Sequence, residues 1–270
     1  MGRIGRSLQL VGQSYRILML DKELILLPLL SGVVIAAVVA SFAFGFGLDF
    51  TRVQRLGPDV YVPLFLIYVV TYAVGIFFQA AVVAGATERM RGGDPTVASA
   101  LAAARRRAVP ILMWAVVAAT VGVILRIIRD RAGFLGKIIA SLLGAAWSLA
   151  TFFVVPVLVL EERPLDESFT RSVAVFKKTW GETMVGGVSL GVAAICAWVT
   201  LVAVAGLLAT VAGPLALAVF AIGAISLAIF FPTLQGVYLA SLFRYATEGE
   251  TDPGFDRSLF EQAFVPKRRQ

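Results

Sequence analysis

Long charge-free runs of hydrophobic residues alternate along the chain with shorter polar segments. The runs occupy residues 24–48, 60–87, 108–125, 138–160 and 183–243. About 20 mostly apolar residues suffice to cross a bilayer, so each of the first four predicts one transmembrane helix. The fifth is too long for one crossing, and Gly206, Gly213 and Pro214 predict a turn near its middle. No run alternates with a period of two, so the pattern predicts an all-α protein with six spans, not a barrel.

Three shorter segments that precede the odd-numbered spans have an amphipathic pattern. Their hydrophobic residues recur at helical spacing: Ile4, Leu8, Val11, Tyr15 and Leu18; Val97, Leu101, Ala104 and Ala108; and Leu165, Phe169, Val173, Phe176 and Trp180. Three prolines are predicted at first helical positions, namely Pro95, Pro164 and Pro253. A glutamate follows each even-numbered span: Glu88, Glu161 and Glu248.

These features predict a repeated unit, in which a cytoplasmic interfacial helix is followed by a hairpin of two spans. The units cover about residues 1–90, 91–160 and 161–249 of one integral membrane domain, and residues 250–270 form a cytoplasmic amphipathic tail. Two interpretations of the amphipathic helices stay open. They pack against their own bundle, or they contact anionic lipid or a partner protein.

Composition and charge agree with a multi-pass membrane protein. Hydrophobic residues make up 59% of the chain and charged residues 15%, against about 25% charged in soluble proteins. Eighteen of the 24 lysines and arginines fall on the side that holds both termini. Positive residues favour the cytoplasmic side, so both termini are predicted inside a cell (inner) membrane. This bias already explains the net charge of +7, which therefore does not indicate nucleic acid.

The chain offers little catalytic chemistry. It has no histidine and one cysteine, so it lacks the commonest general base and metal ligand and cannot form an internal disulfide. Its densest carboxylates are Glu161, Glu162, Asp166 and Glu167, which are expected at a helix start, where they complement the helix dipole. We therefore expect no enzymatic activity, cofactor or metal.

Neutral polar and small residues lie inside the spans. Gln79, Thr151 and Gln235 are expected to bond across helices, or to line a polar path. Pro156 and Pro232 are expected to bend the fourth and sixth spans, with or without a cavity beside them. The pair Gly187 and Gly191 is expected in internal helix packing, and Trp147 is expected deep in the bilayer.

Three stretches carry a resemblance to a known family. They are residues 21–32, from Asp21 to Gly32; residues 147–158, from Trp147 to Leu158, with Glu161; and residues 177–182, from Lys177 to Glu182. On them the chain resembles, over nearly its whole length, a prokaryotic six-span integral membrane family catalogued only as a domain of unknown function. The resemblance implies the architecture and no activity.

The sequence thus favours a scaffold or accessory membrane protein that contacts lipid, or another membrane or cytoplasmic protein, through its cytoplasmic face. Its candidate anionic-lipid contacts are Arg105, Arg106, Arg107, Lys177 and Lys178. The alternative is a facilitator or channel for a neutral or lipidic solute, with Gln79, Thr151 and Gln235 along the path.

Overall fold

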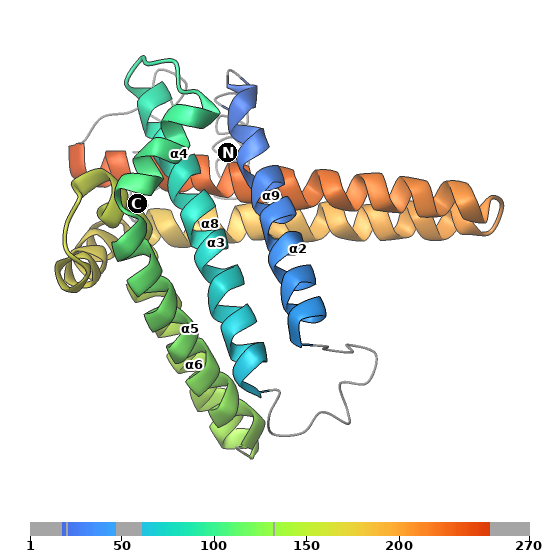
Figure 1. Ribbon diagram of the computed structural model, residues 1–270, viewed down its shortest axis with the longest axis horizontal. Coiled ribbons are helices and arrows are strands. Elements are labelled where there is room, and N and C mark those ends of the chain that lie inside the picture. The colour runs from blue at the N-terminus through green and yellow to red at the C-terminus, as the bar shows by residue number, and fades with distance from the viewer. Residues whose placement is uncertain (1–17, 20, 47–60, 132, 249–270) are drawn as a thin grey trace, which may run out of the picture. The chain divides into compact units, whose positions relative to one another are not determined.

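The described part of the chain is all-α. The computed structural model describes residues 18–19, 21–46, 61–131 and 133–248, and no strand occurs in these ranges. The elements are η1 (Lys22–Ile25), α2 (Leu26–Phe46), α3 (Tyr61–Met90), α4 (Val97–Arg106), α5 (Ala108–Arg131), α6 (Phe134–Ala150), α7 (Val154–Pro156), the π-helical η4 (Val157–Glu161), α8 (Leu165–Ala209) and α9 (Gly213–Glu248) (Figure 1).

Six helical segments are long and apolar enough to cross a membrane, which confirms the six predicted spans. They are Glu23–Gly45, Phe65–Met90, Ala108–Arg131, Phe134–Glu161, Thr183–Ala209 and Gly213–Glu248. The predicted turn in the fifth run lies between α8 and α9. The first amphipathic stripe, apart from Leu18, and the whole C-terminal tail with Pro253 lie outside the described residues.

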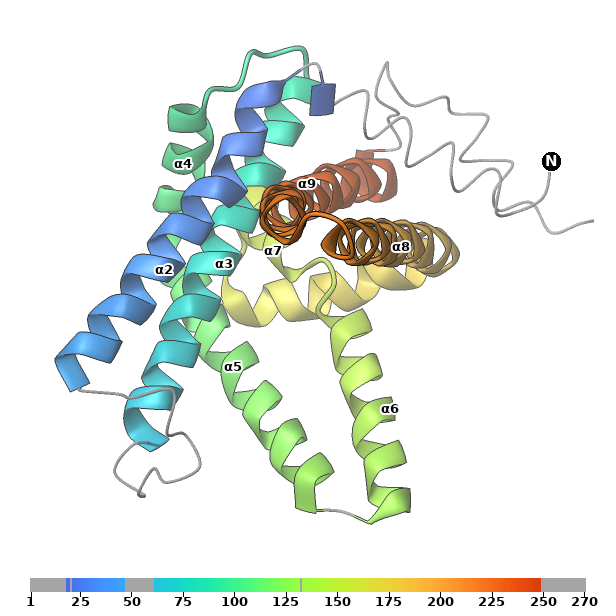
Figure 2. The same ribbon diagram turned by 90° about the vertical axis from the view of Figure 1, so that its right-hand side faces the viewer.

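The chain divides into two compact units. One contains residues 29–84 and 98–176, and the other contains residues 1–28, 85–97 and 177–270. In the first unit, α5 and α6 lie side by side (Figure 1). In the second, the membrane-crossing part of α8 and the following α9 lie side by side in opposite directions (Figure 2). The arrangement as three equivalent hairpins stays a prediction.

The three even-numbered spans are longer than one bilayer crossing, and each changes from exposed to buried along its length. The exposed large side chains of α3 extend to Tyr72, whereas residues 80–83 are buried. The fourth span is exposed at Phe134 and Leu143 and buried over residues 153–159. In α9, which has 36 residues, Ile225 is exposed, and most residues from Thr233 to Arg244 are buried. Exposed apolar side chains suit lipid, so about 20 residues of each span face the bilayer and the rest continue into protein.

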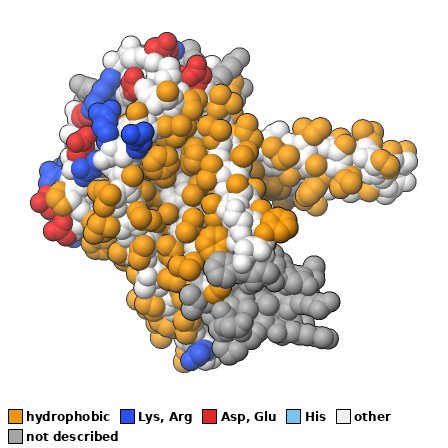
Figure 3. All heavy atoms as spheres, in the orientation of Figure 1, with side chains coloured by type: hydrophobic (Ala, Val, Ile, Leu, Met, Phe, Trp, Pro, Cys, Tyr) orange, Lys and Arg blue, Asp and Glu red, His pale blue; other side chains and the backbone are white. Residues whose placement is uncertain are grey.

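The surface of the helices is largely hydrophobic. Figure 3 shows apolar side chains spread over the helices, whereas charged side chains gather over α4 and the beginning of α8. This distribution is expected when lipid, rather than water, surrounds most of the chain.

The glycine pair expected in internal packing does not pack internally. A Cβ added at Gly187 or Gly191 would have no described atom within 4 Å, so that prediction is wrong. The packed glycine is instead their neighbour Gly186, where an added Cβ would overlap the Tyr238 hydroxyl and ring. Gly186 therefore provides the space that the buried Tyr238 of α9 occupies.

We predict opposite effects of alanine at these adjacent positions. Gly186→Ala forces Tyr238 to move and should lower the free energy of unfolding by about 1–3 kcal/mol. Gly187→Ala adds a helix-favouring methyl in open space and should be neutral or stabilising by up to about 1 kcal/mol. Reversible unfolding in mixed detergent micelles measures both. Equal effects of the two variants would contradict the packing of Tyr238 on Gly186.

Candidate functional site

The most distinctive local feature is a break in the fourth span. Helix α6 ends at Ala150, residues 151–153 form a turn, and α7 and the π-helical η4 complete the span. Pro156 has no N–H to donate to the carbonyl of Phe152, four residues earlier, and its ring crowds that carbonyl, which explains an interruption at residues 151–153. The expected bend at Pro156 is thus confirmed as an interruption, whereas α9 continues as a helix through Pro232.

A side chain from α8 repairs the break. The backbone N–H of Phe153 donates to the Ser172 hydroxyl at 3.0 Å, and this hydroxyl donates to the carbonyl of Ala150 at 2.7 Å. Phe153 and Ser172 are both fully buried. Thr151 closes the last turn of α6 by donating its hydroxyl to the Trp147 carbonyl at 2.8 Å. The Phe153 amide and the Ala150 carbonyl therefore find a partner within the protein, which a bilayer does not supply.

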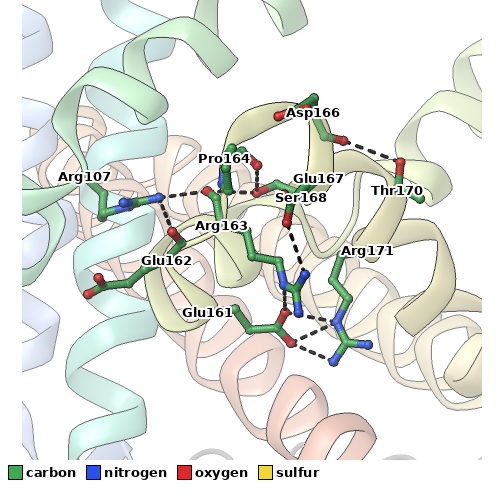
Figure 4. Close-up of polar contacts among 10 residues, drawn as sticks. All are labelled: Arg107, Glu161, Glu162, Arg163, Pro164, Asp166, Glu167, Ser168, Thr170 and Arg171. Atoms are coloured by element: carbon green, nitrogen blue, oxygen red, sulfur yellow. Dashed lines mark hydrogen bonds and ion pairs between the residues drawn. The ribbon is translucent and has the colours of Figure 1, made fainter.

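An arginine closes the end of the same span. The Nε of Arg107 donates to the carbonyl of Leu158 at 3.0 Å, and its Nη2 donates to the carbonyls of Glu162 and Arg163 at 2.6 and 2.8 Å (Figure 4). Carbonyls at the end of a helix have no partners in the helix, and a guanidinium also complements the negative end of the dipole. Arg107 is thus engaged with the backbone, whereas Arg105 and Arg106 are exposed on α4.

Glu161 lies between two arginines. The Arg171 guanidinium contacts both carboxylate oxygens at 2.7–3.0 Å, and Arg163 Nε donates to Oε2 at 2.6 Å (Figure 4). Its carboxylate raises the pKa of the exposed Arg163, chiefly through this hydrogen bond. Glu161 ends a helix rather than starting one, so its expected place at a helix start is wrong. Asp166 and Glu167 do lie in the first turn of α8.

The sixth span ends in the same way. Glu248, the last residue of α9, accepts from Arg91 Nη2 at 2.7 Å and from Arg244 Nε at 3.2 Å. A carboxylate is unfavourable at the negative end of a helix dipole, and two guanidinium groups compensate for it. The repeated glutamates of the sequence therefore include two that are each held by a pair of arginines.

The first residues of α8 have three distinct sides. The buried side carries Ser168, Ser172 and Val175. At about 100° per residue, the apolar residues Leu165, Phe169, Val173 and Phe176 lie roughly a quarter turn to one side. Glu167 and Arg171 lie roughly a quarter turn to the other. This segment thus packs by its hydroxyl side, and its apolar stripe lies on a flank, where Phe169 is 36% exposed.

Aromatic rings connect this flank to the fourth and third spans. The ring centroids of Trp114 and Trp147 are 5.8 Å apart, and those of Trp147 and Phe169 are also 5.8 Å apart. Trp147 therefore lies beside the beginning of α8, and its expected position deep in the bilayer stays a prediction.

The helix starts differ slightly from the predictions. Pro164 lies immediately before α8, and Pro95 lies two residues before α4, so neither occupies the first helical position. The amide of Val97, the first residue of α4, donates to the Glu23 carboxylate at 3.2 Å. This contact supplies an acceptor for a backbone N–H group at the helix start, which has no partner within the helix.

No hydrogen bond joins the three residues of the predicted polar path in the described part of the chain, and the path stays a prediction. Gln79 is half-buried in α3, and Thr151 bonds to its own helix. Gln235 is exposed on α9 in the other unit. Lys177 and Lys178 are exposed on α8 just before a kink at Thr179. Among the described residues, no three acidic or cysteine side chains form a group that could hold a metal.

The chain belongs to DUF6159, a family of unknown function whose model matches residues 59–255. The match contains the broken fourth span, Ser172 and both arginine-held glutamates. It is narrower than the resemblance seen in the sequence, because residues 21–32 lie outside it. No curated protein and no solved structure shows significant similarity to the chain.

We predict that Ser172 stabilises the protein through the break. Ser172→Ala leaves the amide of Phe153 and the carbonyl of Ala150 without their partner and should lower the free energy of unfolding by about 1–3 kcal/mol. Ser168 is an equally buried control, because its hydroxyl bonds only to carbonyls next to its own helix start. Ser168→Ala should cost less than about 1 kcal/mol in the same detergent unfolding assay. Equal losses would mean that Ser172 acts only by packing.

A second prediction concerns Asp21, which precedes η1 and is 6% exposed. Its Oδ2 has no hydrogen-bond partner among the described residues and lies 4.0 Å from Arg89 Nε. Burial raises the pKa of this carboxyl, and Arg89 offsets only part of that effect. Above the raised pKa the buried charge destabilises the folded state, and below the ordinary value of 3.8 the penalty is absent.

Asp21→Asn should therefore stabilise the protein on the order of 1 kcal/mol at neutral pH, and this gain should vanish as the pH falls toward 4. Unfolding measured between pH 4 and pH 8 tests both statements. Asp94→Asn is the control, because Asp94 pairs with the same arginine while its side chain is 95% exposed. A gain that does not depend on pH would contradict the assigned cause.

Proposed function

We propose that this protein is a non-enzymatic accessory protein of the inner cell membrane that binds anionic lipid through its cytoplasmic face. In this proposal both termini are cytoplasmic, and the spans hold the beginning of α8 in the headgroup layer. The proposal rests on the three-sided start of α8, together with the asymmetric distribution of lysine and arginine.

The three sides of α8 suit a helix that lies at a membrane interface. The hydroxyl side is fixed to the fourth span through Ser172, and the apolar and charged residues lie on the two opposite flanks, which are partly exposed. One flank carries the apolar stripe that ends in Phe176, and the other carries Arg171 and Glu167. An interfacial helix needs this division, with apolar side chains toward the acyl chains and charged side chains toward water and headgroups.

Charge favours anionic lipid on the same side. Each lysine or arginine near an acidic leaflet contributes about 1 kcal/mol of attraction. Eighteen basic residues occupy the predicted cytoplasmic segments, among them the exposed Arg105, Arg106, Lys177 and Lys178. The excess of lysine and arginine on one side predicts the orientation, and the same residues form the proposed binding surface.

The facilitator alternative has less support. A broken span suits a transporter when its free backbone groups line a path. Here the Ser172 hydroxyl binds the Phe153 amide and the Ala150 carbonyl, and the Thr151 hydroxyl bonds to its own helix. The residues around the break are therefore committed to holding the helix together.

The proposed position of α8 can be tested with probes on its two flanks. In a Cys196→Ser background, Val173→Cys and Ala174→Cys place a fluorescent label on adjacent residues on opposite sides of the buried stripe. In bilayers, a quencher on lipid acyl chains should act mainly on the label at 173, and aqueous iodide mainly on the label at 174. Iodide quenching of both labels would contradict an interfacial helix, and protection of both from lipid and iodide would indicate a protein partner instead.

The second measurement is the composition of the retained lipid. Particles extracted from the membrane without detergent should contain more phosphatidylglycerol relative to phosphatidylethanolamine than the bulk membrane. A composition equal to the bulk would contradict anionic-lipid binding.

A further inference from the structure

A groove between α3 and α4 combines an aromatic wall with two arginines. Its volume is about 680 Å³, and Phe77 and Phe78 of α3 form one side. Arg105 and Arg106, in the last turn of α4, lie at the other. All of these residues belong to one compact unit.

The side of α4 that faces the groove is small and apolar apart from these arginines. Ala98, Leu101 and Ala102 line it, and short side chains leave room for a flexible chain to lie along the helix. The buried residues of α4 are Ala100 and Ala104, on another side of the helix. The lining therefore does not serve to pack α4 on its own bundle.

The groove lies where the exposed part of α3 gives way to its buried part, which we take as the level of the lipid headgroups. Phe77 comes 16 residues after the start of α3 at Tyr61, and at about 1.5 Å each these residues span about 24 Å, most of a hydrocarbon core of roughly 30 Å. Beyond this level, Ala80 and Val83 are buried in protein. The apolar run of α5 begins at Ala108, two residues after Arg106.

The two guanidinium groups at this level are available to an anion. Both arginines are exposed, and neither has an ion-pair partner in the described ranges of the chain. Arg107, by contrast, is committed to three carbonyls. Guanidinium groups bind phosphate oxygens in a planar, bidentate geometry, and their charge does not titrate at physiological pH.

We propose that this groove binds one anionic phospholipid, with its phosphate at Arg105 and Arg106 and an acyl chain along Phe77 and Phe78. The inference rests on the proposed function and deepens it. The proposed basic surface attracts many lipids by charge alone, whereas the groove would bind one lipid per protein at a defined site. The bound lipid would fill an apolar groove and neutralise two cations at the membrane boundary.

Native mass spectrometry of the full chain in mild detergent, titrated with phosphatidylglycerol or phosphatidylcholine, tests the site. The wild-type protein should retain one phosphatidylglycerol in clear preference to phosphatidylcholine. The double variant Arg105→Gln and Arg106→Gln should bind it roughly 30-fold more weakly, the effect expected from losing two basic contacts. Arg105→Lys with Arg106→Lys keeps the charges and should retain most of the affinity, which also reports correct folding.

The matched control removes the same charge elsewhere. Arg129→Gln with Arg131→Gln lowers the net charge by two in the exposed last turn of α5, at the end of that helix far from α4, and should leave the tightly bound lipid in place. Phe78→Ala should weaken phosphatidylglycerol binding without removing an arginine. Inorganic phosphate at millimolar concentration should not displace the lipid.

Three outcomes would overturn the site. They are equal losses in the Arg105–Arg106 and Arg129–Arg131 variants, full retention of the lipid in the Arg105–Arg106 variant, and displacement of the lipid by inorganic phosphate. The first shows diffuse attraction, and the third shows a site for free phosphate. In the first two cases the whole protein should still be enriched in anionic lipid. These outcomes would therefore overturn the groove as a lipid site and leave the proposed function standing.

Discussion

A backbone N–H or C=O group in a bilayer has no water to bond with, and this constraint organises the fourth span and everything attached to it. The span stops being a regular helix at residues 151–153 and ends at Glu161. At both places the chain supplies a side chain in place of water. Ser172 repairs the interruption, and Arg107 covers the last carbonyls.

These two contacts also fix neighbouring elements. Because Ser172 belongs to α8, the repair holds the beginning of that helix against the fourth span by its hydroxyl side. Arg107 lies between α4 and α5, so its bonds to the end of the fourth span also hold the end of α4 in place. Arg105 and Arg106 do not take part in these bonds and stay exposed. The accessible flank of α8 and the groove beside α4 thus both follow from the same requirement of the backbone.

The sequence was sufficient for the parts of the fold that depend on length and hydrophobicity. Six spans follow from charge-free runs, because no other structure keeps that many apolar residues in lipid. The interruption near Pro156 also had a visible signal. Its repair by Ser172 had none, because a serine on an amphipathic helix looks like any surface residue until its neighbour in space is known. Likewise, the run of three arginines gave no sign that Arg107 would bond to the backbone while the other two stay exposed.

The packing errors have one cause. Internal packing was expected at Gly187 and Gly191 because of their spacing. Spacing alone does not say which side of a helix faces a neighbouring helix. The glycine that packs against a neighbour is Gly186, which contacts Tyr238. The apolar stripe of α8 is likewise not its buried side. In water the apolar face of a helix must be covered by protein, but lipid is as apolar as leucine, so packing between helices relies on small and hydrogen-bonding residues. Ser168 and Ser172 are therefore buried while Phe169 stays partly exposed, and exposed apolar residues on this chain do not by themselves require a protein partner.

The groove beside α4 differs from that general apolar surface because two exposed cations border it, and hydrocarbon alone would leave them without a counter-charge.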